Sequence, residues 1–190
     1  MKIAISGLSG VGSSTTGKLV AQRLNLPMNN FTFRDLAKER GVAFEVLQEQ
    51  SKNDEAIDLE LDKRLIEFIN SHENCLSVTD LSCWLDDERV YKKLGLASGP
   101  SFDMKIWLEA PIEERAVRMH EREGGDFQKV LAYNNQRDLD NRERYLKLYG
   151  LDIFDHSNID WVFDTSKLTL EEVVNEVCNR VVDLSQQSTS

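Results

Sequence analysis

Met1-Lys-Ile-Ala-Ile-Ser-Gly-Leu-Ser-Gly-Val-Gly-Ser-Ser-Thr15 opens the chain and decides its fold. Residues 2–6 carry β-branched side chains in the pattern of a short strand, and apolar residues at helical spacing follow at 19–24. Between these segments lie three glycines in six positions, from Gly7 to Gly12. Glycines let the backbone turn so that several N–H groups face one anion, and the N-terminus of the following helix adds partial positive charge. A strand, a glycine-rich loop and a helix in this order predict a phosphate-binding loop.

This loop fits most of the pattern Gly-x-x-x-x-Gly-Lys-Ser/Thr. Gly7, Gly12 and Ser14 match, whereas Ser13 stands where the lysine belongs. We expect the Ser14 hydroxyl to hold a magnesium ion. The residues expected to bind phosphate are Gly7, Leu8, Ser9, Gly10, Val11, Gly12, Ser13, Ser14 and Thr15. The alternative is a glycine-rich turn that binds nothing, which the strand before it and the helix after it disfavour. Because the lysine is missing, other residues have to supply positive charge.

The composition is that of an ordinary globular domain. The chain has 190 residues, of which 41% are hydrophobic and 29% charged, and no apolar run is long enough to span a bilayer. We expect a cytoplasmic protein without a signal peptide or a membrane partner, because the N-terminal segment is itself a core strand. The three cysteines have no metal-ligand spacing and are expected to be reduced. A net charge of −10 argues against polymeric nucleic acid as a partner but permits a small phosphorylated ligand.

Further along the chain, strand and helix patterns alternate. The expected strands after the first are 26–28, 75–79, 104–108 and 160–163, and the expected helices are 31–40, 43–50, 54–72, 110–122, 126–149 and 169–181. This alternation predicts an α/β fold in which helices cover both faces of a parallel five-stranded sheet. Ligands of such sheets bind beyond the carboxyl ends of the strands. The loop from Gly7, Asp80 and residues 164–166 lie at such ends.

Two arginine-bearing helix faces flank the pair Gly124-Gly125, which we expect to act as a hinge. The first face has Arg115, Arg118 and Arg122, and the second has Arg137, Asn141 and Arg144. Arginine suits phosphate because its fork donates two parallel hydrogen bonds. The alternative is a pair of solvated faces, ion-paired with the nearby acidic residues Glu114, Glu121, Asp138 and Glu143.

Asp80 and Arg34 are further candidates. Asp80 follows a buried strand close to the loop, where it either holds magnesium through water or orients a substrate, or is an ordinary cap of the strand end. Arg34 follows the aromatics of Phe31-Thr-Phe33 and is either an anchor for the phosphate of a second substrate or a surface arginine on an amphipathic helix.

Several segments together resemble the short, archaeal-type cytidylate kinases, members of the P-loop nucleoside monophosphate kinases. They are residues 5–16, 33–41, 57–64, 105–111, 137–152 and 160–166, and they follow one another in register through about residue 182. The resemblance implies a three-layer P-loop kinase fold as a single domain over 1–184. Its parts would be a helical segment for the nucleoside monophosphate at 29–71 and an arginine-bearing lid at 122–145. We expect residues 185–190 to be a disordered tail.

The resemblance also implies the reaction and the roles of the arginines. ATP with Mg²⁺ would phosphorylate CMP or dCMP, giving ADP and the diphosphate, in a monomeric enzyme. Arg34 would hold the monophosphate, and Arg137, Asn141 and Arg144 would contact the acceptor or the transferred group. Arg118 and Arg122 would bind ATP phosphates when the lid closes. In this branch a hydroxyl residue often replaces the loop lysine, as Ser13 does here.

Two departures from the family lie on the acceptor side. Where the family has Glu-Gly-Arg-Leu-Ala-Gly-Trp, this chain has Val78-Thr-Asp-Leu-Ser-Cys-Trp84, so Asp80 replaces the arginine that contacts the acceptor nucleotide. Met28-Asn-Asn30 replaces Ser-Ala-Gly. Two alternatives therefore stay open: a kinase of the same fold with another small acceptor, and a nucleotide-binding protein without catalysis.

Overall fold

The strands pair in parallel into one sheet with the order β2-β3-β1-β4-β5. The computed structural model describes residues 1–29, 31–51 and 53–187. Its strands are β1 (Lys2–Gly7), β2 (Met28–Asn29), β3 (Cys75–Val78), β4 (Met104–Glu109) and β5 (Trp161–Asp164). The β-branched residues of β1 are fully buried because helices cover both of its faces. The predicted parallel sheet of five strands is confirmed for the described part of the chain.

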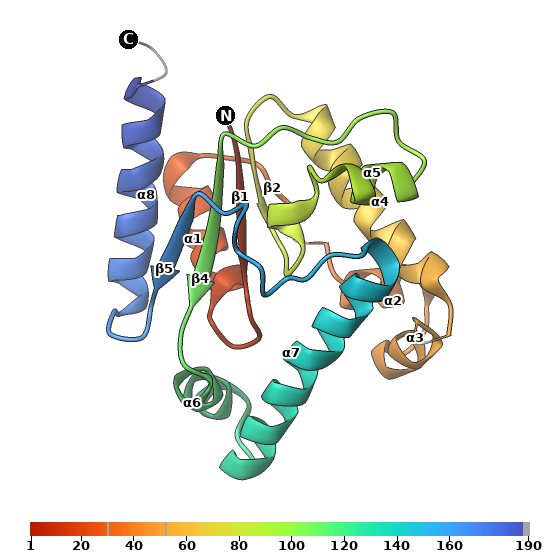
Figure 1. The fold of residues 1–190 in the computed structure, drawn as a ribbon. Coiled ribbons are helices and arrows are strands. Elements are labelled where there is room, and N and C mark those ends of the chain that lie inside the picture. Colours follow the sequence, from red (N-terminus) through yellow and green to blue (C-terminus); the bar gives the residue numbers. More distant parts are fainter. Residues whose placement is uncertain (30, 52, 188–190) are drawn as a thin grey trace.

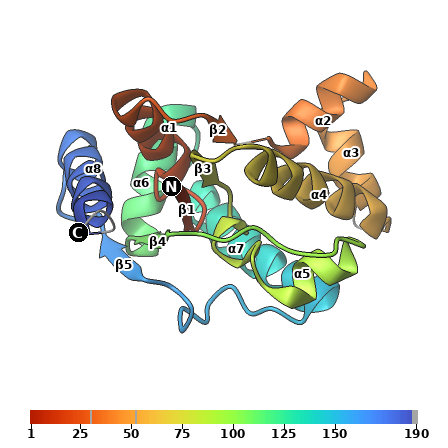
Figure 2. The same ribbon diagram turned by 90° about the horizontal axis from the view of Figure 1, so that it is seen from above.

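Two layers of helices enclose the sheet (Figure 2). The helices are α1 (Ser13–Leu24), α2 (Phe33–Arg40), α3 (Phe44–Ser51), α4 (Glu55–Ser71), the 3-10 turn η1 (Ser82–Trp84), α5 (Glu88–Lys93), α6 (Ile112–Glu123), α7 (Phe127–Tyr149) and α8 (Leu170–Gln187). Apolar side chains of α1 and α8 form one core with the sheet, and those of α4, α7 and η1 form the core on the opposite face. The three-layer architecture is therefore as expected.

Local capping explains several helix boundaries. Asp54 caps α4 by accepting from Ala56 N–H, and Thr169 with Glu172 forms the predicted capping box before α8. The turn η1 and α5 were not predicted. The expected tail was wrong at its start, because α8 continues through Gln187; residues 188–190 and Asn30 lie outside the described residues.

The loop after β1 lies at the edge of the sheet formed by the carboxyl ends of the strands. This loop lies between the ends of β3 and β4, since these strands flank β1. Below this edge α6 lies beside the start of α7, and α7 extends from there toward α4 and α5 (Figure 1). Gly124 and Gly125, with φ of 73° and 94°, make the turn between α6 and α7 in a backbone region that favours glycine.

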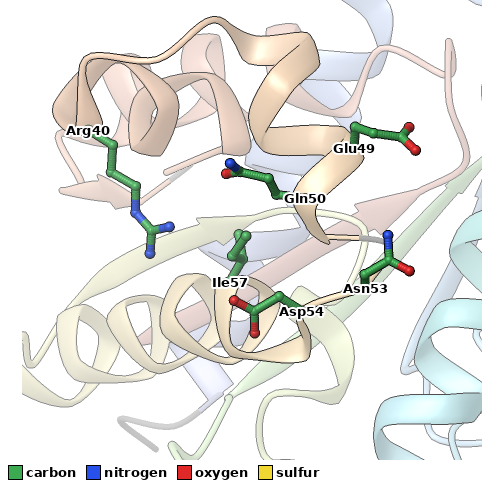
Figure 3. Close-up of a pocket in the computed structure, with 6 residues that line it drawn as sticks. All are labelled: Arg40, Glu49, Gln50, Asn53, Asp54 and Ile57. Carbon is green, nitrogen blue, oxygen red and sulfur yellow. The ribbon is translucent and has the colours of Figure 1, made fainter.

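The helices α2, α3 and α4 form the segment at 29–71 and stand beside the sheet (Figure 1). A pocket of about 540 Å³ opens among them (Figure 3). Its lining consists of Arg40, Glu49, Gln50, Asn53, Asp54 and Ile57. None of these residues belongs to the loop after β1 or to α7, so this pocket is separate from the sheet edge. Among the described residues, no helix is both long and apolar enough to cross a membrane.

Candidate active site

The phosphate loop (residues 7–15) connects β1 to α1 with the geometry that the glycines predict. Gly12 is the N-cap of α1 with φ 96°, and no side chain caps this helix within the described residues. The first N–H groups of α1 therefore remain available to an anion. A Cβ on Gly7 would lie 2.6 Å from the carbonyl oxygen of Leu108, so the loop passes close to β4 only because Gly7 has no side chain.

A buried ion pair holds the loop from below. Asp138 of α7 accepts a hydrogen bond from the Ser9 N–H at 3.0 Å, and Arg115 of α6 donates to the Ser9 carbonyl at 2.8 Å. Arg115 and Asp138 are 2.7 Å apart and both side chains are 5% exposed. This arrangement differs from the expectation that Ser9 presents its N–H to phosphate, because α7 already uses that donor. It also removes Arg115 from the cationic face predicted for α6.

One face of α7 connects the loop to the end of β3. Asn141, three residues after Asp138, donates from Nδ2 to Oδ2 of Asp80 at 2.8 Å. Asp80 follows β3, the strand that lies next to β1 in the sheet. The bond from Asn141 therefore holds α7 over the end of β3. Arg137 is exposed and lies close enough to Asp80 to lower its pKa. The structure thus brings together the predicted residues Asp80, Arg137 and Asn141.

Burial raises the pKa of Asp80, and the nearby guanidinium groups of Arg137 and Arg144 oppose this effect. A carboxylate in this position reduces the positive potential that the two arginines offer to an anion. The resemblance noted above implies an arginine at this position, so Asp80 would reverse the charge at this point of the site.

Arg144 contacts the helical segment rather than the loop. Its Nη1 lies 3.6 Å from Oδ1 of Asp58 on α4, its Nη2 donates to the Tyr145 hydroxyl at 3.1 Å, and its guanidinium lies 5.5 Å from the ring centre of Phe33. Its buried Nε has no hydrogen-bond partner among the described residues. The guanidinium therefore has a donor that the described contacts leave unused.

Beside Arg144, a buried carboxyl group joins the same two helices. The Tyr149 hydroxyl of α7 donates to Asp62 of α4 at 2.6 Å, and both residues are at least nine-tenths buried. Burial raises the pKa of Asp62 to about 7, although the hydrogen bond from Tyr149 opposes the shift. The segment at 29–71 is thus attached to α7 through polar groups.

Arg118 and Arg122 lie on α6, on the other side of the loop. Arg118 donates to the Val11 carbonyl at 3.0 Å and to the Thr165 carbonyl at 2.7 Å. It therefore connects the loop to the end of β5, where residues 164–166 were expected near the ligand. Arg122 is exposed and pairs with Glu123 at 2.6 Å. Arg118 touches the loop in this conformation, and Arg122 does not.

Arg34 is a second predicted site residue, besides Arg122, that the structure leaves apart from the loop. It is exposed on α2, with its guanidinium 4.3 Å from the ring centre of Phe44 on α3. Its neighbour Phe33 is the residue that reaches Arg144. Contact of Arg34 with an acceptor would require it to leave Phe44.

The described residues suit a magnesium ion only when a bound nucleotide supplies further ligands. Ser14 is exposed in the first turn of α1, and no group of three or more acidic, His or Cys side chains within the described ranges could hold a metal by itself. Magnesium often takes one protein ligand and completes its shell with phosphates and water. The Ser14 hydroxyl is the loop group that suits this role.

Known structures define the class of fold. A shikimate kinase from Bacteroides thetaiotaomicron superposes with a TM-score of 0.57 at 17% identity over 98% of each chain. A deoxyadenosine kinase from M. mycoides with dCMP and dCDP bound superposes with a TM-score of 0.57 at 15% identity, over 97% of this chain and all of that chain. At these identities the similarity concerns the fold alone, which is that of the P-loop kinases.

Sequence relatives define the family. Residues 3–142 match the family model described as "AAA domain". Cytidylate kinase 2 of Borrelia garinii subsp. bavariensis is 35% identical over 91% of this chain and 92% of its own length. The cytidylate kinase of Methanocaldococcus jannaschii is 33% identical over 98% of this chain and 100% of its own length. The chain belongs to the family of that domain model and to the cytidylate kinases.

Proposed function

We propose that this protein is an ATP-dependent cytidylate kinase, which transfers the γ-phosphoryl group of ATP to CMP or dCMP. The observation that carries the proposal is the course of α7. This helix is fixed to the phosphate loop through Asp138, to the end of β3 through Asn141 and to the acceptor segment through Arg144. A donor phosphate at the loop and an acceptor phosphate near Arg144 would therefore face the same helix.

On the donor side, the open N–H groups at the start of α1 would hold the phosphates of ATP. Magnesium, held by the Ser14 hydroxyl, would neutralise charge on the donor phosphates. The missing lysine leaves a need for positive charge, which Arg118 would supply; its hydrogen bond to the Val11 carbonyl of the loop supports this role. Arg122 would join it when the lid closes about Gly124-Gly125.

On the acceptor side, Arg137 and Arg144 would orient the monophosphate and stabilise charge on the transferred group. Phosphoryl transfer asks for alignment and electrostatic stabilisation more than for covalent chemistry by the protein. Asn141 would be held in place by Asp80 so that its amide oxygen remains free to accept from the substrate. Closure of the helical segment and the lid would exclude water, which otherwise competes as the acceptor.

Product analysis tests this proposal directly. Purified protein with ATP, Mg²⁺ and CMP should form CDP and ADP in equal amounts, with little ADP formed when CMP is omitted. ADP without CDP would show hydrolysis in place of kinase activity and would refute the proposal.

Asp80 favours one second candidate, a kinase of this fold with another small acceptor. The acidic group stands where the family uses an arginine for the acceptor nucleotide, so this is the point at which acceptor choice would change. Transfer to a different monophosphate at a higher kcat/KM than to CMP would establish that candidate.

A further inference from the structure

Asn134 has no part in the proposed reaction, yet it lies beneath the phosphate loop. Its side chain on α7 is 0% exposed. Neither Nδ2 nor Oδ1 of its carboxamide has a hydrogen-bond partner in the described part of the chain. A buried amide is nearly always paired, because an unpaired one gives up its hydration without compensation. The fold as it stands therefore does not explain the choice of asparagine at this position.

The unpaired amide lies close to Gly10 of the loop. A Cβ on Gly10 would come within 3.1 Å of Asn134 Nδ2 and 2.8 Å of the Arg115 carbonyl oxygen. Gly10 has φ 84°, so it occupies a conformation that other residues rarely adopt. Ser9, the residue before it, has a buried hydroxyl that also lacks a hydrogen-bond partner among the residues described. The junction between the loop and α7 thus holds two unpaired polar groups, the Ser9 hydroxyl and the Asn134 carboxamide.

Asn134 precedes Asp138 by four residues, so both lie on the same face of α7. Asp138 already holds the Ser9 N–H at 3.0 Å. The helix therefore faces the Ser9–Gly10 segment at two places, of which one is bonded and the other is not. A movement of the loop that gives the Asn134 carboxamide a hydrogen-bond partner would strengthen the attachment of the loop to α7, the helix that carries Arg137.

We infer that Asn134 is a positioning residue of the phosphate loop, whose carboxamide pairs with the Ser9 hydroxyl when the loop holds the phosphates of a nucleoside triphosphate. A ligand shifts a protein between two conformations only through interactions that differ between them. The hydrogen bond between Asn134 and Ser9 would exist with nucleotide bound and not without it. Pairing gained on binding adds to nucleotide affinity. The identity of the ligand as ATP rests on the proposed function; the role of Asn134 rests on the loop contacts.

The variant Asn134→Leu tests the inference, because leucine has a similar size and no polar atoms. Without nucleotide its Tm should equal or exceed that of the wild type, since an unpaired buried amide is removed. Its Kd for ATP, measured by calorimetric titration, should rise by about fivefold or more, with a smaller Tm shift on adding ATP. The KM for the acceptor should change little. The matched control is Asn135→Leu, an exposed neighbour on α7, which should leave the Kd unchanged.

Ser9→Ala provides the second test and decides the matter if Asn134→Leu does not fold. Removing the hydroxyl should also weaken ATP binding, and the double variant should be no weaker than either single one, since both remove the same bond. An unchanged Kd for ATP in either single variant would overturn the inference, as would full additivity. Wild-type protein that binds ATP but does not phosphorylate CMP would refute only the proposed activity; wild-type protein that does not bind ATP would refute both.

Discussion

Asn141 of α7 donates a hydrogen bond to Asp80 at the end of β3, over a distance of 2.8 Å. The bond joins two residues that are 61 positions apart, and the Asp80 carboxylate also interacts electrostatically with the guanidinium groups of Arg137 and Arg144. Asp80 therefore has two opposite effects on the proposed acceptor site. It fixes the orientation of the Asn141 amide, and it weakens the positive potential that attracts an anionic acceptor.

The variant Asp80→Asn separates these two effects. Its amide oxygen can still accept from Asn141, while the negative charge is removed, so the KM for CMP should fall by roughly threefold or more. Steady-state kinetics with varied CMP at saturating ATP measures this change. The control is Asp140→Asn, which removes an exposed charge from α7, the helix that carries Asn141. A higher KM for CMP in Asp80→Asn would mean that the carboxylate itself binds the acceptor.

Arg137 should matter for turnover and not for folding. Its side chain is exposed and forms no ion pair within the residues described, so Arg137→Ala should leave the Tm within a degree or so of the wild-type value. If it stabilises the transferred group, kcat should fall by about 100-fold or more. Arg142→Ala is the matched control, since Arg142 pairs with Asp152 outside the site. Near-normal turnover in Arg137→Ala would remove this residue from the mechanism.

The Arg115–Asp138 pair should dominate the stability of the sheet edge. Asp138→Ala leaves a buried guanidinium without its partner, and we expect the free energy of unfolding to fall by about 3–5 kcal/mol. Urea denaturation measures the loss. Replacing both partners, as Arg115→Met with Asp138→Leu, should cost less than Asp138→Ala alone, because no charge stays buried. A loss below about 1 kcal/mol for Asp138→Ala would contradict the buried pair.

Asp62 should make stability depend on pH. Burial raises its pKa from 3.8 to about 7, so between these values the folded chain binds a proton that the unfolded chain has released. Folding stability due to Asp62 is therefore greatest below about pH 4 and falls as the pH rises through 7. Asp62→Asn keeps an acceptor for Tyr149, removes this dependence, and should be the more stable protein at pH 8, by an amount on the order of 4 kcal/mol.

Unfolding measured at pH 4 and at pH 8 tests this expectation. The difference in stability between Asp62→Asn and wild type should grow with pH, whereas Glu67→Gln, an exposed change on the same helix, should show little pH dependence. A difference that stays constant between the two pH values would mean that Asp62 is not the titrating group.

Local patterns in the sequence were sufficient to predict the fold. The glycines between β1 and α1, the capping box before α8 and the alternation of strands with helices all depend on neighbours in the chain. Hydrophobic periodicity identified the sheet strands for the same reason. The turn η1 and α5 escaped prediction because three and six residues are too few for helical periodicity to show.

The site was predicted less completely, because its contacts join distant parts of the chain. The spacing of Arg137, Asn141 and Arg144 indicated a shared face of one helix. In the structure, Asn141 on this face donates a hydrogen bond to Asp80. Spacing could not reveal that Asp138 would bind Ser9, 129 positions away. The role of Asp62 also escaped, since its Tyr149 partner lies 87 positions away. The i, i+4 spacing of Asn134 and Asp138 was the one local signal for the contact beneath the loop.

The most direct test of the central claim is ADP release by the purified protein with ATP and Mg²⁺, compared across CMP, dCMP, UMP, AMP, GMP and dTMP. The account predicts that CMP or dCMP gives the highest kcat/KM and that the other acceptors give little. No release with any acceptor while ATP still binds, or a clear preference for another nucleotide, would contradict it.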